Sequence, residues 1–384
     1  MQRNESRPQT GHAPADDAHV PFSSNAVRLR PRHWLFVAAV LAVLIYSIPV
    51  LWTRIEKLDA GPDYRVPYRL SHDYWHVRRY FSRAAAENKT LVLGDSVVWG
   101  HYVGKEETLS HYLNELAGDA GFANLGIDGI HPAAMAGLVE HYGTDIADKR
   151  VLLHLNLLWM SSRRHDLTSG KESALNHPKL VSQFYTAVPD YRASLSERIG
   201  IVVGRKVPFF GWVDHVRIAY FEDADLPRWT LEHPYANPAS AVTLELPSPG
   251  EPPVSEQAAR PWTATGIRPF NPPWVELETS LQWRSFRRTV EVLRSRANAV
   301  FVLVGPFNEH MLGPESLATY RERVRQAAAW LKEQGIPHAA PPPLPSEYYA
   351  DASHPLAEGY RLLAEQLMQD EAFLQFQQAR ADGH

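Results

Sequence analysis

The stretch that decides the fold runs from Leu91 to Gly100 and reads LVLGDSVVWG. Apolar, strand-forming residues end abruptly at Gly94-Asp95-Ser96, and a helical pattern begins soon afterwards. This order predicts a buried strand whose carboxyl end presents Ser96, with the backbone N–H groups of the following turn available to an anion. Because Gly-Asp-Ser also occurs in ordinary turns, a nucleophilic role for Ser96 requires partners elsewhere in the chain.

The segment Asp351-Ala352-Ser353-His354-Pro355 supplies such partners directly before the last predicted helix. A serine nucleophile needs a base to accept its proton, and the base needs a group that fixes its tautomer. Asp351 and His354 lie three residues apart, so they can make a carboxylate–imidazole contact within one loop. Taken alone, the pair is equally well explained as a helix cap with a surface histidine.

Three hydrogen-bond donors are candidates for an oxyanion hole. They are the backbone N–H groups of Ser96 and Gly129 and the side-chain amide of Asn156, which all follow predicted strands. The carboxyl ends of parallel strands meet at one edge of a sheet, where such sheets bind ligands. Each residue also has an ordinary explanation, since glycine permits a left-handed turn and asparagine favours turns at strand ends.

Strands alternate with helices along most of the chain, which predicts an α/β fold with a parallel sheet and helices on both faces. The expected strands are 90–94, 122–129, 151–157 and 300–304, and the expected helices are 71–88, 106–118, one starting at Pro132, 276–297, 314–334 and 356–378. Residues 161–275 break this rhythm with many prolines and tryptophans, including the loop signal Glu251-Pro252-Pro253. We expect this segment to be an insertion packed over the strand ends, as a lid or substrate-binding surface.

The N-terminal region indicates a membrane anchor. Residues 34–52 carry no charge, have Trp34 and Trp52 at their ends, and follow Arg28, Arg30 and Arg32. This pattern predicts one transmembrane helix with a cytoplasmic N-terminus and the rest of the chain outside. A buried core helix and a cleaved signal peptide are the alternatives. The expected organisation is a disordered tail at 1–33, the anchor at 34–52, a linker and juxtamembrane helix at 53–88, and a catalytic domain at 89–380.

Composition excludes several classes of function. The chain has 384 residues, a formal net charge of −4 and no cysteine. The charge argues against a nucleic-acid partner, and the lack of cysteine excludes disulfides, thiol catalysis and cysteine–zinc sites. His101, His131 and His154 show no metal-ligand spacing, so neither a metal nor another cofactor is expected. We expect Asn308, Glu309 and His310 to form a solvated loop, and most tryptophans to belong to the core.

Taken in order, these residues resemble the SGNH (GDSL-like) hydrolase superfamily. The resemblance rests on Gly94-Asp95-Ser96, then Asn124, Gly126 and Gly129, then Asn156, then Asp351-x-x-His354, and it covers about 90–156 and 299–378. The family's third block usually reads Gly-x-Asn-Asp, whereas this chain has His154-Leu155-Asn156-Leu157. The Gly-x-Ser-x-Gly elbow of α/β-hydrolases is absent.

The resemblance implies a three-layer α/β/α, flavodoxin-like fold with assigned roles. Ser96 would be the nucleophile, His354 the general base and acid, and Asp351 its orienting group. Gly129 and Asn156 would join Ser96 in the oxyanion hole.

The chemistry expected from these residues is acyl transfer through a serine ester, to water or to another hydroxyl. A membrane-tethered domain of this kind is similar to the alginate O-acetyltransferase-like and D-alanyl-transfer families, which modify cell-envelope polysaccharides. The resemblance therefore implies an O-acetyl esterase or O-acetyltransferase acting on an envelope glycan, in the periplasm if the source is bacterial. The alternatives are a lipase, lysophospholipase or thioesterase of the same fold, and a non-catalytic glycan-binding or assembly protein.

Overall fold

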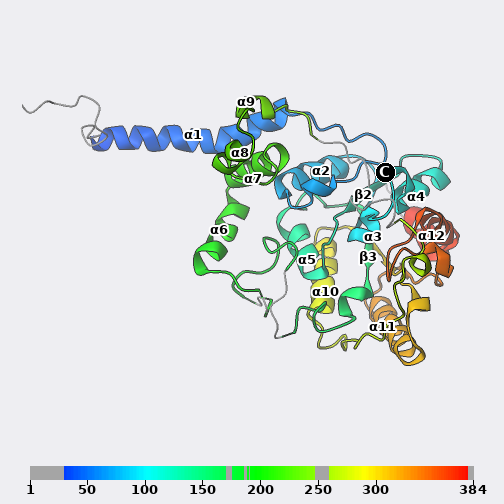
Figure 1. Ribbon diagram of the computed structural model, residues 1–384. Coiled ribbons are helices and arrows are strands. Elements are labelled where there is room, and N and C mark those ends of the chain that lie inside the picture. Colours follow the sequence, from blue (N-terminus) through cyan, green and yellow to red (C-terminus); the bar gives the residue numbers. More distant parts are fainter. Residues whose placement is uncertain (1–29, 170–174, 186–187, 190, 247–258, 379–384) are drawn as a thin grey trace, which may run out of the picture. The chain divides into compact units, whose positions relative to one another are not determined.

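The computed structural model describes residues 30–169, 175–185, 188–189, 191–246 and 259–378 (Figure 1). The chain divides into two compact units, residues 1–48 and 49–384, and each is described by itself. Most of the expected N-terminal tail and the loop signal at 251–253 lie outside the described residues.

The described part of the first unit is the beginning of α1 (Pro31–Ile55), a helix of 25 residues. Its most apolar 18-residue window has a mean hydropathy of 2.5 and is almost wholly exposed. Among the described residues, α1 is the one helix long and apolar enough to cross a membrane. The prediction of a long, apolar helix at this position is therefore confirmed, whereas its insertion into a membrane and the side on which each end lies stay predictions.

A parallel sheet of five strands forms the centre of the second unit. The strands run in the order β2-β1-β3-β4-β5 and are β1 (Thr90–Gly94), β2 (Phe122–Gly126), β3 (Arg150–Leu155), β4 (Ala299–Val304) and β5 (His338–Ala339). Gly94 lies opposite Gly126, and Leu93 lies opposite Leu153. The predicted α/β class and parallel sheet are therefore confirmed. The strand β5 was not predicted, because two residues are too few to show a periodicity.

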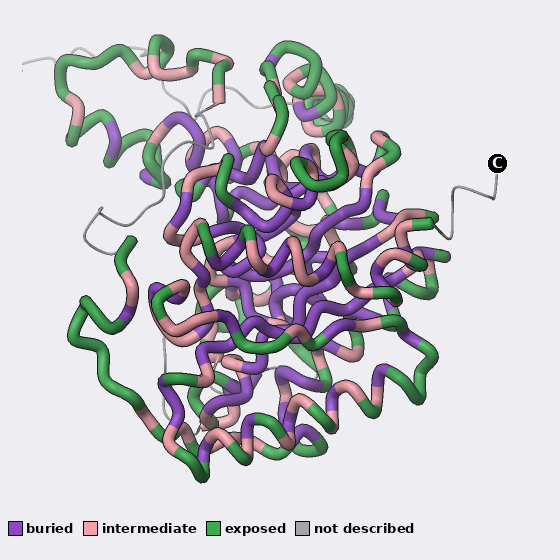
Figure 2. The backbone as a smooth tube through the Cα atoms, turned by 90° about the vertical axis from the view of Figure 1, so that its right-hand side faces the viewer, coloured by how far each residue is buried: buried purple, intermediate pink, exposed green. Residues whose placement is uncertain are grey.

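Helices cover both faces of this sheet. Alternate residues of each strand point to opposite faces, so Leu91 and Leu93 join one apolar cluster and Val92 joins another. Figure 2 shows the buried segments gathered in the interior, with exposed segments outside them. The first cluster contains residues of α2 (Tyr74–Ala86), α5 (Pro132–His141), α10 (Leu281–Ser295) and α11 (Pro314–Glu333). The second contains residues of α4 (Leu109–Ala117), α12 (Ala357–Gln369) and α13 (Glu371–Gln378).

Side-chain caps place several helix ends differently from the sequence prediction. Asp73, rather than Ser71, caps α2 by accepting a hydrogen bond from the His76 N–H at 3.0 Å. Ser280 caps α10, so that helix starts at 281 instead of 276. The single helix expected at 356–378 is two helices, because Asp370 ends α12 and accepts a hydrogen bond from the Phe373 N–H at 2.9 Å. These caps satisfy backbone N–H groups that the helices themselves leave free.

The segment expected to be an insertion forms α6 (Leu195–Lys206), α7 (Pro208–Tyr220), α8 (Leu226–Glu232) and α9 (Pro238–Ala241). The helix α7 packs against α2. The same segment also reaches the loop after β2, where the imidazole of His177 lies 3.0 Å from the backbone oxygen of Asp128. Short 3-10 helices complete the described structure at Tyr68–Leu70, Lys105–Glu107, Leu157–Met160, Trp262–Ala264, Glu309–Met311 and Ser346–Tyr348.

Candidate active site

Ser96 lies where the direction of strand addition in the sheet reverses. It follows β1 and is the first residue of the short helix α3 (Ser96–Trp99). The chain goes from β1 to β2 on one side and then to β3 on the other, so the connections leave β1 and β3 in opposite directions. Open α/β sheets bind ligands in the crevice that this reversal creates.

Two glycines allow α3 to lie close to the ends of the strands. A Cβ atom on Gly126 would lie 2.3 Å from the backbone nitrogen of Trp99, and one on Gly94 would lie 2.4 Å from a methyl group of Val98. Neither distance is compatible with a side chain. The absence of side chains at the ends of β1 and β2 is therefore a condition for this position of Ser96.

The structure brings together the three residues that the sequence predicts for catalysis. His354 Nε2 lies 2.7 Å from Ser96 Oγ, and His354 Nδ1 lies 2.8 Å from both carboxylate oxygens of Asp351. With the proton on Nδ1, the imidazole donates to Asp351 and accepts from the Ser96 hydroxyl. This is the arrangement that general-base activation of a serine requires.

The loop that carries Asp351 and His354 is fixed from several sides. The Asp351 carboxylate accepts hydrogen bonds from the backbone N–H groups of Ser353 at 2.9 Å and His354 at 3.0 Å. The Tyr102 hydroxyl donates to the same carboxylate at 3.2 Å, and the Asn308 side chain donates to the Asp351 backbone oxygen at 3.1 Å. Asn308 is fully buried, so the expectation that it lies in a solvated loop is wrong.

Charges around His354 favour its protonated form. Burial would lower the pKa of His354, but the Asp351 carboxylate, with smaller contributions from Asp95 and Asp128, raises it above 6.5. Burial would likewise raise the pKa of Asp351, but attraction and hydrogen bonds from His354 hold it well below its usual range. The site therefore favours the imidazolium form of His354, as a base that accepts a serine proton requires.

Asp95 is a buried acceptor directly beside Ser96. Asn156 Nδ2 and Trp159 Nε1 each donate to it at 2.9 Å, and the Val97 N–H donates at 3.0 Å. His154 Nδ1 lies 3.2 Å from it, within ion-pair distance. Burial would raise the pKa of Asp95, but attraction to His154 and these donors outweigh it and lower the pKa to about 2. A permanent carboxylate thus holds the turn that presents Ser96.

The three candidate oxyanion donors lie in different settings. The backbone N–H groups of Ser96 and Gly129 make no hydrogen bond to any described residue, and Gly129 has a left-handed φ of 69°. Asn156 gives one amide hydrogen to Asp95 and accepts from the Leu158 N–H at 3.0 Å. One amide hydrogen of Asn156 therefore stays available, and the roles of Gly129 and Asn156 in an oxyanion hole stay predictions.

Arg65 supports the nucleophile turn, although it lies in the segment expected to be a linker. Its guanidinium donates to the backbone oxygens of Trp99 at 2.8 Å, Gly100 at 2.6 Å and Val103 at 2.9 Å. It also lies over the Trp99 ring, 3.9 Å from the centroid. Arg65 and its neighbours Tyr64 and Val66 are buried. No periodicity marks these residues in the sequence, so sequence reasoning missed them together with Tyr102, His101, Asp128 and Trp159.

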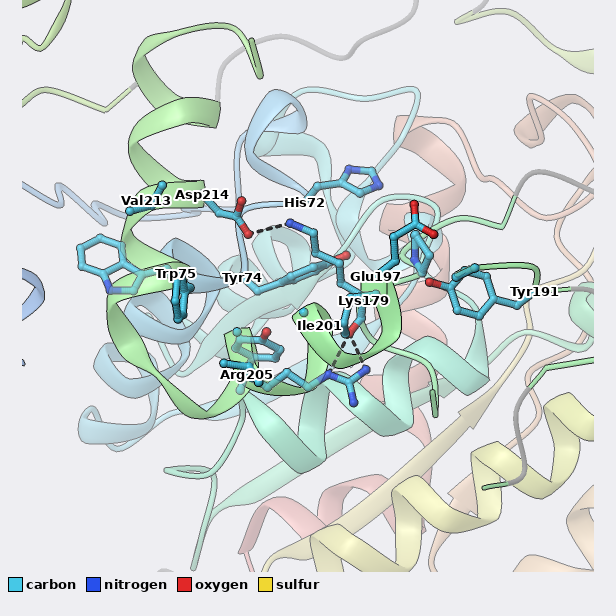
Figure 3. A pocket seen from close by; sticks show the side chains of 18 of the residues that line it. His72, Tyr74, Trp75, Lys179, Tyr191, Glu197, Ile201, Arg205, Val213 and Asp214 are labelled. Atoms are coloured by element: carbon cyan, nitrogen blue, oxygen red, sulfur yellow. Dashed lines mark hydrogen bonds and ion pairs between the residues drawn. The ribbon is translucent and has the colours of Figure 1, made fainter. Parts of the chain in front are cut away.

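A cavity of about 650 Å³ lies between α2, α6 and α7, and the three candidate catalytic residues do not line it. Figure 3 shows Lys179 reaching across it to Asp214, with a nitrogen–oxygen distance of 2.6 Å. Arg205 holds the Lys179 backbone oxygen from below, with an Nε–O distance of 2.9 Å. Tyr74 and Trp75 of α2 form part of the wall. This cavity is separate from the site around Ser96.

The histidines considered as metal ligands differ in their surroundings: His131 has a structural hydrogen-bond partner, whereas neither ring nitrogen of the buried His154 makes a hydrogen bond to a described residue. Within the described parts of the chain, no group of three or more histidine or acidic side chains is arranged to hold a metal ion. His131 caps α5 by accepting from the Ala134 N–H at 3.3 Å. Trp229, Trp262 and Trp283 are buried, as expected for core tryptophans.

Comparison of the sequence with models of known protein families and with curated proteins found no match. Function is therefore inferred from the geometry around Ser96.

Proposed function

We propose that this chain is a serine-dependent acyl-ester hydrolase or O-acyltransferase of the SGNH type. The observation that carries the proposal is the hydrogen-bonded series Ser96–His354–Asp351, assembled from residues 258 positions apart in the chain. The strand order and the place of Ser96 after β1 also agree with the flavodoxin-like sheet that the resemblance implies. A binding protein would have no need of all three residues in this arrangement.

The proposed reaction has two halves. His354 Nε2 takes the proton of Ser96 while Oγ attacks the ester carbonyl, and the developing oxyanion accepts hydrogen bonds from the N–H groups of Ser96 and Gly129 and from Asn156. His354 then gives the proton to the leaving alcohol, which leaves an acyl group on Ser96. In the second half, water or another hydroxyl attacks this ester with His354 again as base.

The substrate class rests on the resemblance. It is an acyl ester outside the membrane, with O-acetyl groups of a cell-envelope polysaccharide as the favoured case. The anchor at 34–52 would hold the domain near envelope-polysaccharide machinery, on the periplasmic side in a bacterium. Lipase, lysophospholipase and thioesterase activities use the same triad and remain the alternatives within the enzyme class.

The test compares wild type, Ser96→Ala and Ser295→Ala with p-nitrophenyl acetate, using the full chain in detergent. We expect Ser96→Ala to lose at least about 1,000-fold in kcat, because removal of a triad nucleophile leaves only the oxyanion hole and binding. Ser295 ends α10 shortly before the amino end of β4, at the opposite edge of the sheet from Ser96, and is the matched control. An oligosaccharide acceptor and mass spectrometry of the products distinguish acetate release from transfer to sugar.

A fluorophosphonate probe separates the enzyme from a non-catalytic protein. We expect it to label wild type at Ser96 and to leave Ser96→Ala unlabelled. A folded wild type that takes no label would favour the glycan-binding or assembly protein instead.

A further inference from the structure

A second imidazole–carboxylate pair lies beside the candidate triad. His101 Nδ1 lies 2.6 Å from Asp128 Oδ1, and the two side chains are 22% and 13% exposed. The ring centroid of His101 lies 5.4 Å from that of His354. The His101 backbone N–H donates to the Ser96 backbone oxygen at 3.1 Å. Besides the buried His154–Asp95 contact, the site therefore holds two partly exposed imidazole–carboxylate pairs, whereas activation of the serine uses one.

The backbone of Asp128, the acidic residue of this second pair, is held in place by buried side chains. Asp128 precedes Gly129 in the loop after β2, and its backbone oxygen accepts from His177 Nε2 at 3.0 Å. His177 Nδ1 in turn accepts from the Tyr74 hydroxyl at 2.9 Å. Tyr74 and His177 are buried. Asp128 is thus anchored to α2 through two buried side chains.

Because Nδ1 of His101 contacts Asp128, only Nε2 can bind a substrate. In the neutral tautomer that donates its Nδ1 proton to Asp128, His101 has a lone pair on Nε2. Nε2 makes no hydrogen bond to any described residue, and the side chain is partly exposed. It is therefore a free acceptor next to the catalytic imidazole, suited to an O–H donor. The hydroxyl that reacts must give its only proton to His354, so His101 requires a second hydroxyl.

We propose that His101, oriented by Asp128, binds the hydroxyl adjacent to the one that carries the acyl group, so that the enzyme selects vicinal diols such as sugar rings. This inference rests on the proposed function. In the first half of the reaction, the diol is the alcohol that leaves the cleaved ester. In a transferase, an acceptor diol attacks the acyl group on Ser96 from that same position in the second half. The same contact therefore selects the ester of a hydrolase and the acceptor of a transferase.

The chemical step itself is unchanged by this contact. In acylation, the bond from Ser96 Oγ to the carbonyl carbon forms, the bond from that carbon to one diol oxygen breaks, and His354 gives its proton to that oxygen. The neighbouring hydroxyl keeps its proton and donates a hydrogen bond to His101 Nε2. Two adjacent diol oxygens thus meet two adjacent imidazoles.

The test uses two esters that differ only by the neighbouring hydroxyl, cis-cyclohexane-1,2-diol monoacetate and cyclohexyl acetate. The readout is the ratio of their kcat/KM values, measured on the full chain in detergent. We expect wild type to favour the diol ester by about tenfold, which corresponds to about 1.4 kcal/mol and lies at the upper end of what one neutral hydrogen bond contributes. His101→Phe keeps an aromatic ring against His354 but lacks the acceptor nitrogen, so its ratio should fall close to one.

The chain supplies a matched control. His111 and Asp63 form a pair of nearly the same geometry away from the triad, with a 2.8 Å contact and exposures of 25% and 14%. His111→Phe should keep the wild-type ratio. Asp128→Asn should also lose the preference, because an amide that donates to Nδ1 moves the proton of His101 to Nε2.

Two results would overturn the inference: a wild-type ratio near one, or a His101→Phe ratio equal to that of His111→Phe. Failure of the proposed function is a distinct result. It would show as ester cleavage that persists in Ser96→Ala, whereas serine-dependent cleavage with no diol preference would reject the role of His101 alone.

Discussion

At the scale of single residues, three carboxylates act on the imidazole of His354. Asp351 contacts it directly, and Asp95 and Asp128 add a smaller electrostatic attraction. A raised pKa makes His354 a stronger base when it is neutral. The same shift means that a larger share of the enzyme is protonated, and therefore inactive, near neutral pH.

The first prediction at this scale concerns the acid limb of the pH–rate profile. Because His354 must be neutral to accept the Ser96 proton, kcat/KM for p-nitrophenyl acetate should rise with pH through an apparent pKa above 6.5. Asp351→Asn removes the charge that raises the pKa of His354 most. The acid limb of the profile should therefore move to lower pH, while the rate falls by about 10,000-fold. Rates between pH 5 and 10 measure both effects. A wild-type limb at or below 6.5 would contradict the assignment of His354 as base.

The second prediction concerns Arg65, which holds three backbone oxygens of the turn after Ser96. Arg65→Met keeps much of the side-chain volume but removes these donors. We expect a loss of about 2 to 4 kcal/mol in unfolding free energy, since buried acceptors lose charged donors. Urea denaturation measures the loss. Arg69→Met, at an exposed position nearby, is the control and should change the unfolding free energy by less than about 0.5 kcal/mol.

The sequence was sufficient to predict the three side chains that meet as a candidate triad, but not the residues that hold them in place. Ser96, His354 and Asp351 carry a pattern of residue types and spacing that reflects their chemistry. Arg65, Tyr102 and the pair His101–Asp128 act through contacts that depend on how long loops return to the strand ends. No local propensity encodes such contacts, so only the folded chain shows them.

At the scale of elements, the apolar runs predicted the strands well because this sheet is covered on both faces. The strands at 90–94 and 299–304 lie within one residue of their expected bounds. Helix ends were less accurate, because a polar residue such as Asp370 can be read as part of a helix or as its cap. The helices of residues 161–275 were not predicted, since their prolines fall at first-turn positions, as Pro208 and Pro238 do.

The third prediction concerns the contact between α3 and β2. Gly126→Ala would place a Cβ atom 2.3 Å from the Trp99 backbone nitrogen, and backbone atoms cannot move aside as a flexible side chain can. We expect a loss of at least about 2 kcal/mol in unfolding free energy and a lower kcat for ester cleavage. Gly200→Ala is the control in α6, where a Cβ would meet nothing within 4 Å. That substitution should stabilise the protein slightly, by about 0.5 to 1 kcal/mol.

At the scale of the whole second unit, a buried charged cluster connects three distant segments. His215 of α7 lies 2.7 Å from Glu56 and 2.6 Å from Asp73, and all three side chains are fully buried. Burial would lower the pKa of His215, but the two carboxylates raise it to about 9. Burial would raise the pKa of Glu56, but His215, Tyr220 and Trp52 lower it to about 2.

The fourth prediction is a stability change at alkaline pH. Because the folded-state pKa of His215 exceeds its unfolded value of 6.5, its contribution is fully present below pH 6.5 and is lost as pH rises through about 9. Urea denaturation midpoints of the full chain should therefore fall between pH 6.5 and 9.5. His215→Gln should flatten this dependence and cost about 3 to 5 kcal/mol at pH 6.5, because it breaks a buried ion pair and leaves Asp73 without its cation, while Glu56 keeps its ion pair with Arg79. An equal alkaline loss in wild type and His215→Gln would contradict this role.

The end of α1 limits how far the second unit could move from a membrane that α1 crosses. Trp52 contacts Trp212 at a ring-centroid distance of 5.5 Å and donates to Glu56, four residues further on. If residues 34–52 cross a bilayer as proposed, the chain between the membrane and the first buried carboxylate can extend at most about 14 Å. With so short a connection, the domain would stay at the membrane surface. On the function proposed above, a polysaccharide would then be modified only at the membrane surface, and chains already released into solution would lie out of reach.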